Sequence, residues 1–93
     1  MFKIPRTNVI ESDSGYSVEV LGRTGILYQE GDRQIKIDSE VLMGSPAMTI
    51  YTFSISQWLP PFENDQILPA DRERIIENIK SAFLFRGIEV DFQ

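Results

Sequence analysis

Apolar and polar residues alternate through the first half of the chain, which is the pattern of strands in a half-buried sheet. The alternation is clearest in Tyr16–Val20 and Gln34–Asp38. Glu30–Arg33 predicts a hairpin turn, because Gly31 and Asp32 tolerate the positive φ angles of tight turns. The strands expected in this half are 8–11, 16–20, 26–30, 34–38 and 48–55.

Met48–Ile55 is the strongest of these predicted strands, with apolar residues on both of its faces. Such a run is typical of a central strand, or of one that is covered on its second side. A short apolar run, Val41–Met43, comes before it and leads into the turn-forming residues Gly44–Pro46. We therefore expect Met48–Ile55 to be a central strand or a strand whose second face is covered.

The hydrophobic period changes after Pro69, from two residues to the 3.6 residues of an amphipathic helix. Pro69 suits the first position of a helix and Gly87 the position after the last, so a helix is predicted over Pro69–Arg86. Ile88–Phe92 alternates again and predicts a final strand.

The predicted fold is a single α+β domain, 1–93. An antiparallel meander sheet of five to seven strands comes first, followed by one long C-terminal helix and the final strand. The expected core residues are Val18, Val20, Ile35, Ile37, Ile50, Ile75, Ile79, Phe83 and Val90.

The composition limits the chemistry that the chain can perform. There is no Cys and no His, which excludes disulfides, thiolate metal sites and the usual general base. No phosphate-binding, nucleophile-elbow or zinc-protease motif is present. We therefore predict no enzymatic activity, no metal and no cofactor.

The chain also shows no sign of membrane contact. Its first residues lack the apolar stretch of a signal peptide, and no apolar run approaches the ~20 residues of a membrane helix. We expect a soluble, cytoplasmic protein.

The net charge of −5 is concentrated in residues 37–71. This stretch carries five acids and no base, while nine acids and nine bases cancel in the remainder. Binding to nucleic acid requires a basic patch, and none is visible. The charge is consistent with a basic protein partner, or with acids that only keep a small domain in solution.

A segment without a regular pattern, 56–66, links the predicted sheet to the helix. Its Trp58-Leu59-Pro60-Pro61 motif is stiff, because Pro60 and Pro61 each fix a φ angle. Trp58 fits either an interface anchor or a plug of the core, and we favour the core.

Acidic residues follow this motif and are the best candidates for contact with a partner. Glu63 and Asp65 lie in the stiffened loop, and Asp71 lies at the predicted start of the helix. Phe62 adds an apolar side chain beside them. We predict that Phe62, Glu63, Asp65 and Asp71 lie at or beside the partner-binding surface, where rim acids would steer association.

Several segments resemble a family of small bacterial immunity proteins from polymorphic toxin systems, the immunity protein 74 family. They are Val41–Gly44, Ile50–Tyr51, Trp58–Pro61, Ile75–Lys80, Phe83 and Gly87–Val90. The resemblance implies a non-catalytic protein that binds and neutralises a cognate toxin encoded beside it. It transfers no binding residue. The alternative from another class is a structural or regulatory subunit of a larger assembly, docked through a sheet edge.

Overall fold

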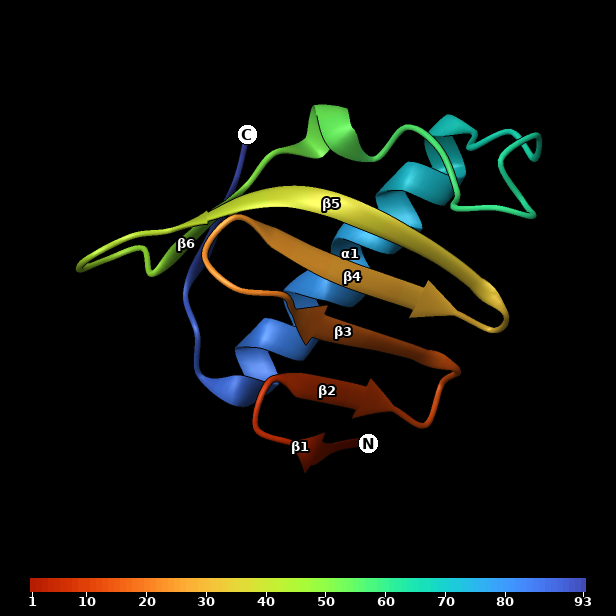
Figure 1. The fold of residues 1–93 in the computed structure, drawn as a ribbon. Coiled ribbons are helices and arrows are strands. Elements are labelled where there is room, and N and C mark those ends of the chain that lie inside the picture. The colour runs from red at the N-terminus through yellow and green to blue at the C-terminus, as the bar shows by residue number, and fades with distance from the viewer.

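The computed structural model describes all residues, 1–93, and contains one seven-stranded sheet whose strand order follows the order along the chain (Figure 1). Strands β1 to β6 pair antiparallel with their neighbours, and β7 pairs parallel with β6. The strands are β1 (Phe2–Arg6), β2 (Val9–Ser12), β3 (Tyr16–Val20), β4 (Gly25–Glu30), β5 (Arg33–Val41), β6 (Met48–Ile50) and β7 (Val90–Phe92).

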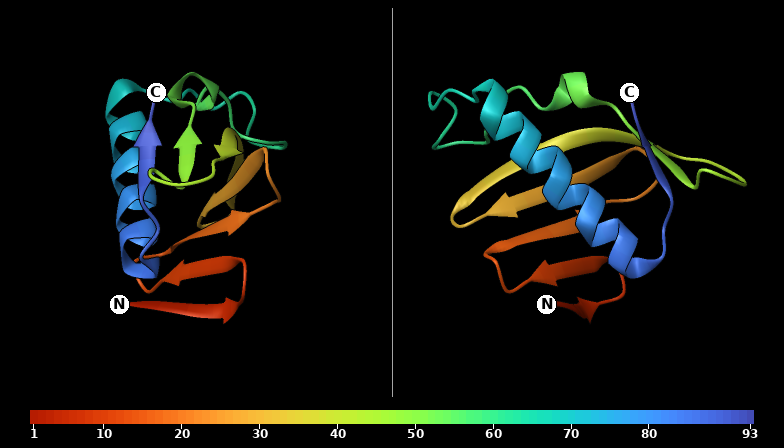
Figure 2. Two further views of the ribbon diagram at one scale, coloured as in Figure 1. Left: turned by 90° about the vertical axis from the view of Figure 1, so that its left-hand side faces the viewer. Right: turned by 180° about the vertical axis from the view of Figure 1, so that it is seen from behind.

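A single α-helix, α1 (Pro69–Arg86), crosses one face of the curled sheet and leaves the opposite face without a helix (Figure 2). Pro69 occupies the first helical position, where its missing N–H costs no hydrogen bond. Gly87 ends the helix with a φ of 78°, a left-handed conformation that glycine adopts without strain. The side chains of α1 that pack on the sheet are Ile75, Ile79, Ala82 and Phe83.

The fold class, the helix and the hairpin turn between β4 and β5 agree with the predictions from the sequence. Most of the expected core is buried as well. Val20 and Val90 are the exceptions, because one ends its strand and the other lies in an edge strand, so both are only partly buried. The largest fully buried side chain, Tyr28, was not among the expected core residues.

The strand predicted at Met48–Ile55 lies inside the sheet, between β5 and β7, as expected, but its predicted length is wrong. β6 ends at Ile50, lies sixth of seven in the sheet, and is followed by a 3₁₀ turn, η1 (Thr52–Ser54). Beyond Ile50 the Asp38 carbonyl oxygen still accepts the Tyr51 N–H, but the Asp38 N–H donates to the Ser54 hydroxyl instead of a backbone carbonyl, so the regular ladder with β5 ends. The Thr52 N–H instead donates to the carbonyl oxygen of Gln93, beyond β7.

Two further features of the sheet escaped the sequence analysis. The N-terminal strand β1 was not predicted, since Phe2–Arg6 contains a proline and little alternation. β7 starts at Val90 rather than at Ile88, and it runs parallel to β6, a direction that the sequence did not indicate. α1 is the crossover between the two parallel strands, which need a long connection of this kind.

A substitution at Ile79 tests how much the packing of α1 on the sheet contributes to the stability of the fold. Ile79 is fully buried, so Ile79→Ala should lower the free energy of unfolding by about 2–5 kcal/mol through lost contacts and a residual cavity. Chemical denaturation followed by circular dichroism measures this. The control, Leu84→Ala, changes a helix residue that is 78% exposed and should stay within about 0.5 kcal/mol of the original protein. A loss below about 1 kcal/mol for Ile79→Ala would contradict the packing described here.

Candidate protein-binding surface

The segment between β6 and α1 runs along the edge of β5 that β6 leaves uncovered (Figure 1). The Tyr51 N–H donates to the carbonyl oxygen of Asp38 at 2.9 Å, and the Leu59 N–H donates to that of Gln34 at 2.7 Å. These bonds fasten the segment at two points four residues apart on β5. The segment therefore presents η1 near one end of β5 and the acidic loop near the other.

The Trp-Pro-Pro motif divides into a buried half and an exposed half. Trp58 is 5% exposed and belongs to the hydrophobic core. Pro60 and Pro61 lie on the surface next to the partly exposed Leu59. The indole thus holds the segment against the core, while the two prolines stiffen the part that faces outward.

Arg33 brings together two of the predicted contact residues of the loop. Its guanidinium group lies 4.9 Å from the centre of the Phe62 ring, in a cation–π arrangement. It also donates to the Asp65 carboxylate at 2.6 Å. The charge of Asp65 is therefore compensated within the molecule. Arg33 was overlooked in the sequence because it precedes these residues by about thirty positions and belongs to the hairpin turn.

Glu63 is placed differently from its neighbour Asp65. Its side chain is partly buried, and one carboxylate oxygen, Oε2, has no hydrogen-bond partner in the protein. No basic side chain lies within ion-pair distance of Glu63. Among the acids of the loop, Glu63 is the one whose charge is left without an ionic partner.

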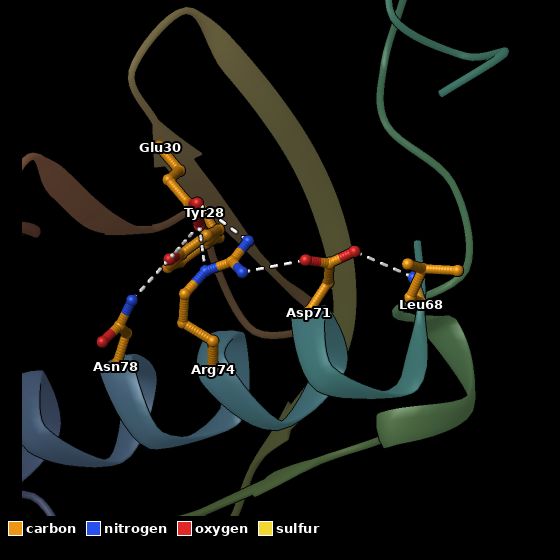
Figure 3. Close-up of polar contacts among 6 residues, drawn as sticks. All are labelled: Tyr28, Glu30, Leu68, Asp71, Arg74 and Asn78. Carbon is orange, nitrogen blue, oxygen red and sulfur yellow. Dashed lines mark hydrogen bonds and ion pairs between the residues drawn. The ribbon is translucent and has the colours of Figure 1, made fainter. Parts of the chain in front are cut away.

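Asp71, the fourth predicted residue, lies in the first turn of α1 (Figure 3). Its carboxylate accepts a hydrogen bond from the Leu68 N–H at 2.9 Å and another from the Arg74 guanidinium at 2.8 Å. The bond from Leu68 and, secondly, Arg74 hold the pKa of Asp71 below its ordinary value. The carboxylate thus caps the start of the helix.

Arg74 extends this contact from the helix to the sheet (Figure 3). It forms an ion pair of 2.9 Å with Glu30, the last residue of β4. The hydroxyl of the fully buried Tyr28 donates to the same carboxylate and accepts a bond from Asn78, both at 2.8 Å. Burial raises the pKa of Tyr28 far above its ordinary value. These bonds join α1 to β4, and single-sequence patterns gave no signal for them.

A second surface lies where the sheet curls, on η1 and the ends of β5 and β7. Phe53 is 70% exposed, and its ring centre lies 6.0 Å from that of Tyr51. The Tyr51 hydroxyl donates to Glu40 at 3.0 Å. In the sheet register Glu40 pairs with Thr49, and Thr49 pairs with Asp91, so the three side chains share one face. We call Asp38, Glu40, Tyr51, Phe53 and Asp91 the η1 surface.

Residues 17–93 match the model of a family described as immunity protein 74. The chain belongs to the immunity protein 74 family. This confirms the resemblance noted in the sequence. No curated protein and no solved structure matches the chain significantly. The family match includes β3 from its second residue, β4 to β7, α1, the acidic loop and the η1 surface, whereas β1 and β2 precede it.

Two further properties of this immunity protein 74 chain bear on its chemistry. The structure brings no group of three or more His, Cys, Asp or Glu side chains together where they could hold a metal ion. None of its helices has the length and apolar character required to cross a bilayer.

The lowered pKa of Asp71 predicts how stability depends on pH. A carboxyl group whose pKa is lower in the folded state stabilises the fold above its unfolded pKa of about 3.9, and this stability is lost as pH falls through the lower, folded value. Asp71→Asn should therefore be less stable than the original protein at pH 7, and the difference should shrink below pH ~4. Urea denaturation midpoints across this range measure the effect.

Glu73→Gln is the matched control, because Glu73 lies on the same helix, is exposed and forms no ion pair. It should leave the pH dependence of the denaturation midpoint unchanged. A difference between Asp71→Asn and the original protein that stays constant from pH 7 to pH 3 would exclude a role for the Asp71 charge in capping α1.

Proposed function

We propose that this protein binds a cognate toxin and neutralises it without catalysis, by covering a surface that the toxin needs. The observation that carries the proposal is membership of the immunity protein 74 family over residues 17–93. In our proposal the protein acts in the cytoplasm of the cell that also makes the toxin.

The polar contacts between α1 and β4 support a non-catalytic mode of action. Tyr28 and Asn78 are bonded to each other, and Arg74 is paired with two carboxylates. These groups satisfy one another and fasten the helix to the sheet, so they are occupied in the folded protein. Enzyme sites instead hold donors or charges ready for a reacting group.

Co-expression tests the proposed function directly. The C-terminal domain of a toxin gene next to this gene should arrest growth when expressed alone, and co-expression of this protein should restore growth. Purified protein should also bind an inactive variant of the same toxin domain, measured by titration calorimetry. An unrelated acidic protein of similar size serves as the control. Growth arrest that persists during co-expression, together with the absence of binding, would refute the proposal.

The loop carries its own prediction within this proposal. If Glu63 and Asp65 lie at the rim of the interface, the double variant Glu63→Lys/Asp65→Lys should slow association with the toxin and weaken its salt dependence. The dissociation rate should change little if both acids act only by steering, and it should rise if the partly buried Glu63 or the Arg33-paired Asp65 is buried against the toxin. Surface plasmon resonance at two salt concentrations measures both rates.

Glu73→Lys/Glu77→Lys changes the net charge by the same amount on the exposed face of α1 and serves as the matched control. It should alter the association rate less than the loop variant does. Equal effects of the two variants would mean that only the overall charge matters. Unchanged rates for the loop variant would place the interface away from the loop.

A further inference from the structure

The aromatic pair on η1 is the most exposed aromatic feature of the molecule that is also held in place. Phe53 is exposed over most of its side chain, yet its ring packs against Tyr51. Tyr51 is fixed in turn by its hydroxyl bond to Glu40 and by its backbone bond to Asp38. An aromatic side chain that is ordered before binding loses little entropy when a partner covers it, and aromatic anchors contribute strongly to interfaces.

The acids around this pair are not compensated within the protein. Asp38, Glu40 and Asp91 have no basic side chain within ion-pair distance, unlike Asp65 and Asp71. Asp91 is tied to the same surface, because Gln93 donates to its carboxylate while the Gln93 carbonyl oxygen accepts bonds from Thr52. The bases nearest to this surface along the chain are Lys36 and Arg23, and neither forms an ion pair.

We propose that the η1 surface docks a basic surface of the toxin, with Phe53 as the apolar anchor and Asp38, Glu40 and Asp91 as the complementary charges around it. This inference rests on the proposed function. The uncompensated acids of the η1 surface favour a basic protein partner over a second copy of this chain. A second copy of this chain docked through the same surface would bring acids against acids, which is unfavourable.

The η1 surface and the acidic loop are compatible parts of one interface. Both lie along the edge of β5 that β6 leaves uncovered. The β5 residues that fasten them, Asp38 and Gln34, are four positions apart, about 13 Å along a strand. A standard interface covers about 800 Å² on each partner, which is enough to include both. The η1 surface then forms the centre, which governs dissociation, and the loop forms the rim, which governs association.

Two variants test this proposal. Their binding to an inactive variant of the toxin domain encoded beside this gene is measured and compared with that of the original protein. Phe53→Ala should weaken binding by ~10-fold or more, mainly through faster dissociation. Glu40→Gln/Asp91→Asn should lower the affinity and its salt dependence, while the amide of residue 40 can still accept the Tyr51 hydroxyl bond.

Matched controls lie on exposed positions of α1, outside the residues that define the η1 surface. Leu84→Ala removes another exposed apolar side chain, and Glu73→Gln/Glu77→Gln removes two exposed acids. Both controls should bind within ~2-fold of the original protein, since residues outside an interface change affinity little. Melting temperatures of all variants verify folding. If Phe53→Ala lowers the melting temperature, the affinity of Glu40→Gln/Asp91→Asn decides whether the η1 surface binds the toxin.

The outcomes separate the two proposals. If the original protein binds the toxin and both η1 variants bind equally well, the η1 surface is wrong and the proposed function stands. If the original protein neither binds nor protects, the proposed function itself fails. Sedimentation velocity tests whether a second copy of this chain occupies the η1 surface instead. A dimer that Phe53→Ala abolishes would assign the surface to that second copy and overturn the inference.

Discussion

The burial of the apolar stripe of α1 against the inward side chains of the sheet is the interaction on which the other features depend. Ile75, Ile79 and Phe83 are fully buried there together with Tyr28 from β4. A helix of 18 residues is about 27 Å long, so α1 reaches across several strands. This length returns the chain to the end of the sheet at which β6 begins, so β7 runs parallel to β6. It also commits one face of the sheet to the core and leaves the other free.

The polar contacts around Asp71 and Arg74 fix how this helix lies on the sheet. Hydrophobic burial is not directional, and a helix stripe alone tolerates rotation and sliding. The bonds from α1 to Glu30 and Tyr28 specify one position, because they require particular atoms to meet. The buried Tyr28 hydroxyl would be costly without its two partners. These contacts therefore supply specificity, while the apolar stripe supplies most of the stability.

Local patterns predicted the fold well, because periodicity reports which side of a segment is buried. The helix from Pro69 to Arg86 and the turn at Gly31 followed from period, proline and glycine positions. The early end of β6 did not, since it depends on a bond from the Asp38 N–H to the Ser54 hydroxyl and on one from the Thr52 N–H to the Gln93 carbonyl oxygen. The acidic loop and Asp71 were visible in the sequence as candidates. The ion partners of Asp65 and Asp71, and the exposure of Phe53, depend on tertiary contacts that no local pattern contains.

Ion pairs within the protein determine which of its acidic side chains keep an uncompensated negative charge. The sequence places the excess charge in residues 37–71, but Arg33 and Arg74, from outside that stretch, compensate Asp65 and Asp71. Asp38 and Glu40 keep their charge, and Asp91 joins them across β6. The remaining unpaired acids are spread over a turn, the loop, the face of α1 and the start of β7, namely Asp32, Glu63, Glu73, Glu77 and Glu89. The uncompensated acids nearest to an ordered, exposed aromatic ring are therefore those of the η1 surface. In the proposed interface, long-range attraction and short-range apolar contact would act on the same few residues, a combination that orients a basic partner and then holds it.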